Sequence, residues 1–181
     1  MTSALSGDHL LIVDDDEGPR QSLDLIFRDQ YKVTTASSGE EAVALSKKEP
    51  FAIAIVDIRM AGLSGIEVLK ELKEIFPFTE VIILTAYESL DSARQAIANG
   101  ASEYLSKPFE IDHIQEGVKK CQNRFNFITK QDRIIQDAMD EVKNAFINLL
   151  SHELKTPLNG IARFTDLIDD GNLNIDQSEY I

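Results

Sequence analysis

Residues 51–57 read FAIAIVD, an apolar run that ends at an aspartate. A strand with one face in solvent would alternate apolar and polar residues, whereas a continuous apolar run predicts burial on both faces. Such strands belong to parallel sheets that are covered by helices on both sides. Further apolar or β-branched runs at residues 9–13, 31–36, 81–84 and 103–105 predict four more strands. The run at 51–57 therefore indicates an α/β domain built around a parallel sheet.

Amphipathic stretches separate the predicted strands. Each contains a residue typical of the first helical turn or the cap before it, and these are Pro19, Ser38, Ser64 and Ser89. The pair at residues 99–100, Asn-Gly, is a typical helix end. Five strand–helix units in succession predict a doubly wound sheet of five parallel strands.

Charge and composition exclude several classes of partner. The chain of 181 residues has 31 acidic and 18 basic side chains, a net charge of −13. Nucleic acid and anionic membrane surfaces both need a basic patch, so we expect neither as a partner. The single cysteine, Cys121, cannot form an internal disulfide. No apolar run approaches the roughly 20 residues of a membrane span, and no signal peptide is visible, so we expect a cytoplasmic protein.

Polar side chains lie at the carboxyl ends of the predicted strands, where open α/β sheets bind ligands. They are the acidic triplet at residues 14–16, Asp57, Thr85 and Lys107. Clustered carboxylates repel one another and favour a bound cation, and their oxygens suit Mg²⁺. A cation beside a carboxylate, a hydroxyl and a lysine is what phosphoryl transfer needs, since its transition state carries negative charge on three oxygens. The site offers the Asp57 carboxylate as a nucleophile, which would form an acyl phosphate.

Residues 9–121 resemble the receiver domain of bacterial two-component response regulators. The resemblance rests on LIVDDD at 11–16, VDIRMAGLSG at 56–65, LTA at 84–86 and SKPF at 106–109. Order, spacing and strand context all agree with the family. The resemblance implies a flavodoxin-like fold and a phosphoryl group received from a cognate histidine kinase or phosphotransfer protein.

The resemblance also implies a metal site. Asp57 would be the phospho-acceptor, and Asp15 and the backbone carbonyl of Arg59 would bind Mg²⁺ together with it. Asp14 would contribute to the same Mg²⁺ site through water. The four residues come from two stretches of the chain, at 14–15 and 57–59, so the metal site depends on the fold.

The remaining family positions concern the phosphoryl group and its readout. Thr85 and Lys107 would hold the phosphoryl oxygens, and Tyr104 stands where the family has its aromatic switch residue. Ala61 departs from the family pattern, which usually has proline there. That departure concerns the stiffness of the loop and leaves the chemistry intact.

From residue 111 onward no strand is predicted, and apolar residues recur with alternating steps of four and three. This heptad seam consists of Ile114, Val118, Cys121, Phe125, Ile128, Asp132, Ile135, Met139, Val142, Phe146 and Leu149. Asp132 is its polar exception, which can set register at some cost in stability. One small domain cannot bury such a seam, so we expect a long helical stalk that forms a parallel coiled-coil homodimer.

Residues 151–158 read SHELKTPL. His152 lies two residues from both Leu150 and Leu154, so on a helix it points away from that apolar stripe. Glu153 could serve as its base, since an imidazole nitrogen must be free of its proton to attack. The string resembles the H-box of the dimerisation and phosphotransfer domain of sensor histidine kinases. The resemblance implies that His152 is a phospho-acceptor and that the chain dimerises through these helices.

We therefore expect a receiver domain at 1–121, a coiled-coil linker helix at 122–145 and a partial phosphotransfer domain at 146–181. The second helix of that last domain would barely begin, near residues 177–181. No Gly-rich phosphate loop occurs in the sequence, so the chain should not phosphorylate itself from ATP. We expect it to be the N-terminal piece of a longer hybrid sensor histidine kinase, in which the receiver regulates the helix that bears His152.

Two alternative interpretations remain. The chain could be a stand-alone receiver with a non-catalytic dimerising tail. This interpretation and that of a hybrid kinase differ in whether a kinase domain supplied in trans can phosphorylate His152. It could also be a structural coiled coil with a degenerate receiver. The intact Asp57, Thr85 and Lys107 argue against this last class.

Overall fold

The computed structural model describes residues 8–86 and 90–169. The chain divides into two compact units, Met1–Gln131 and Asp132–Ile181. The strands are β1 (His9–Val13), β2 (Lys32–Ala36), β3 (Ile53–Asp57), β4 (Glu80–Thr85) and β5 (Glu103–Ser106). The helices are α1 (Glu17–Phe27), α2 (Gly39–Lys48), α3 (Gly65–Ile75), α4 (Leu90–Ala98) and α5 (Ile111–Asp169). The element expected near residues 177–181 lies outside the described residues.

The sheet of the first unit has five parallel strands in the order β2-β1-β3-β4-β5. This confirms the predicted doubly wound α/β fold. The strand order reverses at β1, because β2 lies on one side of β1 and β3 on the other. This reversal places a crevice outside the carboxyl ends of β1 and β3. Val13 pairs with Val56, and Asp57 pairs with Leu84. The carboxyl ends of β1, β3 and β4 therefore meet at the same edge.

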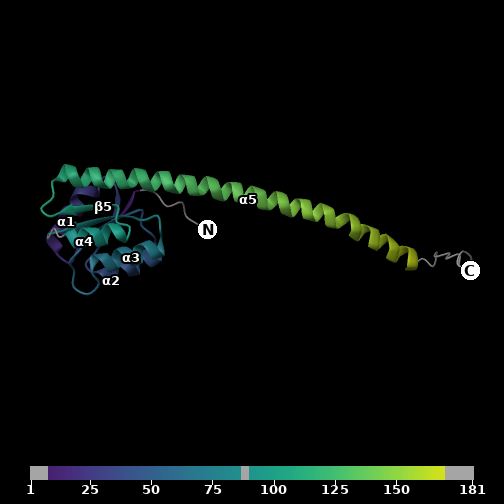
Figure 1. Cartoon of the computed structure of the whole chain (residues 1–181), viewed down its shortest axis with the longest axis horizontal. Helices are drawn as coiled ribbons and strands as arrows, with labels where there is room; N and C mark the ends of the chain where they lie inside the picture. The colour runs from purple at the N-terminus through teal and green to yellow at the C-terminus, as the bar shows by residue number, and fades with distance from the viewer. Residues whose placement is uncertain (1–7, 87–89, 170–181) are drawn as a thin grey trace, which may run out of the picture. The chain divides into compact units, whose positions relative to one another are not determined.

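Helices cover both faces of the sheet (Figure 1). Every residue of β1, β3 and β4 is buried, as the continuous apolar runs predicted. Successive side chains of β1 enter different cores: Leu10 and Ile12 join one, Leu11 and Val13 the other. The first core includes residues of α1 and α5, and the second includes residues of α2, α3 and α4. A strand that serves two cores is apolar along the stretch whose side chains enter them.

The predicted heptad seam has two different environments along α5. Its first four residues, Ile114, Val118, Cys121 and Phe125, are fully buried in the core of the first unit. Apolar residues of the seam within the second unit are exposed in the single chain: Ile135, Met139, Val142, Phe146 and Leu149. The early part of the seam therefore owes its apolar character to the sheet it packs on. Among the described residues, no helix is long and apolar enough to cross a membrane.

Candidate functional site

Three charged side chains meet at the carboxyl edge of the sheet. Asp14 directly follows β1, Asp57 is the last residue of β3, and Lys107 directly follows β5. Lys107 Nζ lies 2.7 Å from Asp14 Oδ2 and 2.6 Å from Asp57 Oδ1. Both carboxylates are buried and the lysine is largely so. The fold thus brings together three of the predicted site residues, from positions 14, 57 and 107 of the sequence.

The second oxygen of each buried carboxylate is held by its own loop. Asp14 Oδ1 accepts a hydrogen bond from the backbone amide of Asp16 at 3.0 Å. Asp57 Oδ2 accepts one from the backbone amide of Arg59 at 2.9 Å. Each side chain is thereby fixed in orientation, which is the condition for a carboxylate to act as a positioned ligand or nucleophile.

Burial and charge act in opposite directions on Asp57. Desolvation and the neighbouring Asp14 raise the pKa of the Asp57 carboxyl, while the hydrogen bond and charge of Lys107 oppose the rise. For Lys107, burial lowers the pKa, but the bonds and charges of Asp14 and Asp57 outweigh it and the pKa lies above its usual value. Lys107 is therefore held as a cation between the two carboxylates.

Thr85 and Tyr104 lie on the two strands beyond β3. Thr85 ends β4 and is fully buried, and its carbonyl accepts a bond of 2.6 Å from the backbone amide of Lys107. Tyr104 lies on β5, paired with Ile83. Its hydroxyl is 3.0 Å from Ser92 Oγ on α4. The predicted switch residue is thus linked to a helix through a serine that the sequence did not single out.

Asp15 has a different neighbourhood from its two acidic partners. It is exposed, and its Oδ2 accepts a hydrogen bond from the backbone amide of Ala61 at 3.1 Å. Over the ranges 8–86 and 90–169, no three His, Cys, Asp or Glu side chains are gathered closely enough to hold a metal ion as they stand. The donors nevertheless fit a hard divalent cation, because all are oxygens and the three carboxylates exceed the charge of Lys107 by two.

The loop between β3 and α3 is packed closely against Asp57. The Gly65 amide donates to the Ile58 carbonyl at 3.1 Å, and a Cβ at Gly65 would overlap the Asp57 carbonyl oxygen. Ser64 caps α3, and Glu67 returns the bond in a capping box. From α2, Glu40 Oε1 accepts from the Leu63 amide at 3.0 Å. Sequence reasoning missed Glu40, since an acid in the first turn of a helix already has a local explanation.

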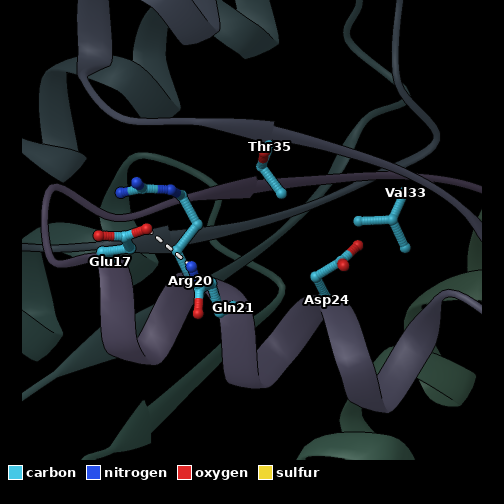
Figure 2. A pocket seen from close by; sticks show the side chains of 6 residues that line it. All are labelled: Glu17, Arg20, Gln21, Asp24, Val33 and Thr35. Atoms are coloured by element: carbon cyan, nitrogen blue, oxygen red, sulfur yellow. Dashed lines mark hydrogen bonds between the residues drawn. The ribbon is translucent and has the colours of Figure 1, made fainter.

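A hollow of about 320 Å³ is lined by residues of α1 and β2 (Figure 2). Its lining consists of Glu17, Arg20, Gln21, Asp24, Val33 and Thr35. Arg20 also reaches the site itself, where its Nη1 donates to the Asp14 carbonyl at 2.7 Å. A single arginine in a helix carries no sequence signal for such a contact, and the residue was not predicted.

His152 belongs to the second unit, whereas the acidic edge, the cluster of Asp14, Asp57 and Lys107, belongs to the first. It lies on α5 with 82% of its side chain exposed, and Glu153 beside it is 72% exposed. His152 Nδ1 is 3.8 Å from Glu153 Oε1. The imidazole is therefore open to solvent with a carboxylate next to it.

Comparison with known proteins identifies the first unit. The family described as "Response regulator receiver domain" matches residues 10–119, which is more than half of the chain. The chain belongs to the response regulator receiver family. The sporulation initiation phosphotransferase F of Bacillus subtilis is 37% identical over 117 residues, which cover 64% of this chain and 94% of that protein.

Other receivers are similar to this chain in sequence and fold. The transcriptional regulatory protein ZraR of Escherichia coli strain K12 is 38% identical over 113 residues, 62% of this chain. That match covers only 26% of ZraR. A crystal structure of a receiver domain protein from Clostridium thermocellum is 32% identical, with a TM-score of 0.63 over 66% of this chain and 98% of that one.

The second unit matches a different family. Residues 142–181 match the "His Kinase A (phospho-acceptor) domain". Domains of this family dimerise, and receivers interact with histidine kinases or phosphotransfer proteins. The chain therefore joins a receiver to a phospho-acceptor segment, and it is a protein of two-component phosphorelay signalling.

Proposed function

We propose that the receiver accepts a phosphoryl group on Asp57 from a phosphohistidine and regulates the phospho-acceptor helix that bears His152. The observation that carries the proposal is the buried Asp57 Oδ1, 2.6 Å from Lys107 Nζ at the crevice of the sheet. In the transfer, an Asp57 oxygen forms a bond to phosphorus as the phosphorus–nitrogen bond breaks. The leaving imidazole nitrogen takes up a proton.

Mg²⁺ would be held by Asp14, Asp15, Asp57 and the backbone carbonyl of Arg59. When bound, the ion neutralises the phosphoryl oxygens as negative charge develops on them. Three carboxylates against one lysine leave an excess of two negative charges, which supports a divalent cation. The chain's own part is to fix the carboxylates, and the amides of Asp16 and Arg59 do so for two of them.

Lys107 and Thr85 would hold the phosphoryl oxygens in the product. Lys107 now forms ion pairs with both Asp14 and Asp57, and a phosphoryl group on Asp57 would compete for the same ammonium group. Tyr104 would follow Thr85, since the two lie on the neighbouring strands β4 and β5. Its hydroxyl contact with Ser92 gives such a movement a route to the surface of α4.

His152 would be the second phospho-acceptor, with Glu153 as the adjacent base. We also propose that the chain forms a homodimer through the coiled coil of α5. The exposed apolar residues of the second unit support this, because a contiguous stripe of that kind is normally covered in a soluble protein.

Chemical stability of the phosphoryl group tests the assignments. The chain is incubated with phosphoramidate, a small phosphorus–nitrogen donor, and Mg²⁺, and phosphoryl incorporation is measured by intact mass. We expect an acid-stable, hydroxylamine-sensitive acyl phosphate that Asp57→Asn abolishes and that chelation of Mg²⁺ prevents. Asp29→Asn, at an exposed carboxylate after α1, is the matched control and should remain competent. Incorporation in Asp57→Asn equal to wild type would refute the assignment of Asp57.

A histidine kinase ATP-binding domain supplied in trans tests His152. We expect acid-labile phosphate that His152→Gln removes and Asp57→Asn retains. A wild-type chain that takes up no acid-labile phosphate under these conditions would instead favour a receiver with a non-catalytic dimerising tail.

A further inference from the structure

Four backbone amides of the loop at residues 58–64 donate hydrogen bonds to carboxylates. The donors and their acceptors are Arg59 to Asp57 Oδ2 at 2.9 Å, Ala61 to Asp15 Oδ2 at 3.1 Å, Leu63 to Glu40 Oε1 at 3.0 Å and Ser64 to Glu67 Oε2 at 2.9 Å. The base of the loop is closed by the bond from the Gly65 amide to the Ile58 carbonyl. Acidic side chains therefore help to order the loop that carries the Arg59 carbonyl, a proposed ligand of the cation.

The four acceptors differ in how a bound cation would affect them. Asp15 and Asp57 are themselves proposed ligands, so their carboxylates must adjust when the cation binds. Glu67 lies on α3, three residues after its donor, and belongs to the capping box of that helix. Of the four, only Glu40 is neither a proposed ligand nor part of the helix that follows the loop. Glu40 therefore ties the loop to α2, an element that cation binding need not move.

The Glu40 carboxylate is itself held at the start of α2. Hydrogen bonds from its own backbone amide, from the Leu63 amide and from Ser38 lower the pKa of Glu40, so the group is ionised at neutral pH. Gly62 has a left-handed backbone with a φ of 79°, and a Cβ there would overlap Glu40 Oε1. A Cβ at Gly39, the first residue of α2, would overlap Leu63. The start of α2 and the loop are thus in close contact around this hydrogen bond.

We propose that Glu40 is a positioning residue for the cation site: through the loop at 58–64 it holds the Arg59 carbonyl in place before a divalent cation binds. This inference rests on the proposed function of the acidic edge. A loop that is already ordered loses less conformational entropy when it binds a ligand. Ala61 stands where the receiver family usually has proline, whose ring would restrict the backbone without a partner. This chain lacks that restraint, which leaves more of the ordering to ties such as Glu40.

Titration of the full chain with MgCl₂, followed by ¹⁵N NMR, tests the proposal. Glu40→Ala removes the acceptor, and we expect it to raise the Kd for Mg²⁺ by about three- to tenfold, less than the roughly 10–100-fold cost of losing a group that bonds a ligand directly. Glu40→Gln keeps an acceptor oxygen without the charge and should remain within about twofold of wild type. Glu74→Ala removes one negative charge from an exposed position of α3 and should also remain within about twofold.

Three results of the titration would overturn the proposal. An equal loss of affinity in Glu40→Gln and Glu40→Ala would assign the effect to charge. A Kd in Glu40→Ala equal to that in Glu74→Ala would show that the tie to the loop does not support the site. If wild type itself binds no Mg²⁺, the proposed function fails and this inference fails with it, whereas equal Kd values in wild type and all three variants overturn this inference alone.

Exchange of amide protons with water, measured by NMR without metal, separates positioning from a general loss of structure. With its acceptor removed, the Leu63 amide in Glu40→Ala should exchange about two- to tenfold faster, as expected for one lost hydrogen bond. The Gly65 amide, which donates to Ile58 at the base of the loop, should exchange at the wild-type rate. Equally accelerated exchange at both amides would show that the variant disturbs the start of α3 as well, and it would overturn the assignment of a positioning role.

Discussion

Gly65 determines how closely the start of α3 approaches β3. A Cβ at this position would overlap the carbonyl oxygen of Asp57 and crowd Ile58. We predict that Gly65→Ala lowers the free energy of unfolding by about 1–3 kcal/mol, since the backbone must move to accept the methyl group. Urea denaturation measures the change. Gly18→Ala is the control: nothing lies within 4 Å of its Cβ in α1, so it should be neutral or slightly stabilising.

His9 makes the stability of the first unit depend on pH. Its ring is buried, packs on Phe51 with centroids 4.4 Å apart, and lies 3.3 Å from Thr34 Oγ1. Burial and the charge of Lys32 lower the pKa of His9, and Glu49, 3.5 Å away, opposes them. The unfolded chain therefore binds more protons as pH falls through the usual histidine range near 6.5, and stability falls with it.

The corresponding prediction compares two proteins across that range. In thermal unfolding between about pH 7.5 and 5.5, wild type should lose more stability than His9→Gln, whose side chain does not titrate. The difference between the two curves of stability against pH removes the contributions of the other titrating groups, which both proteins share. Parallel curves would show that His9 does not govern this dependence.

At the scale of elements, α5 contains two neighbouring phenylalanines with different surroundings. Phe125 is fully buried, with its ring 6.2 Å from that of Phe76, whereas Phe127 is 62% exposed. We predict that Phe125→Ala lowers the free energy of unfolding of the first unit by about 3–5 kcal/mol. Phe127→Ala should change it by no more than about 0.5 kcal/mol. Equal effects in chemical denaturation would mean that the core of the first unit does not extend to Phe125.

At the scale of the whole molecule, we expect the exposed stripe of α5 to mediate the proposed homodimer. Val142 is 71% exposed in the single chain and lies on the predicted seam. We predict a dimer by light scattering at micromolar concentration and a shift to monomer in Val142→Asp, because a buried pair of carboxylates would be uncompensated. Asn144→Asp adds the same charge two residues along and off the seam, and it should remain dimeric. A monomeric wild type would contradict the prediction.

The sequence by itself determined the class of fold, because residues 10–13, 53–56 and 81–84 are apolar at every position, and a sheet buried on both faces accommodates such runs. It also determined which side chains end those strands, since a parallel sheet gathers its carboxyl ends at one edge. The meeting of Asp14, Asp57 and Lys107 follows from that rule.

Only the tertiary structure decided where the outlying groups lie. Arg20 reaches the Asp14 carbonyl from α1, and Glu40 and the Ala61 amide make hydrogen bonds to residues 23 and 46 positions away in the sequence. No local pattern encodes these contacts. The seam of α5 shows the same limit. Its spacing is uniform, yet Phe125 is buried on the sheet while Val142 is exposed in the single chain. Periodicity specifies which face of a helix is apolar, whereas what covers that face depends on which surfaces the folded chain brings against it.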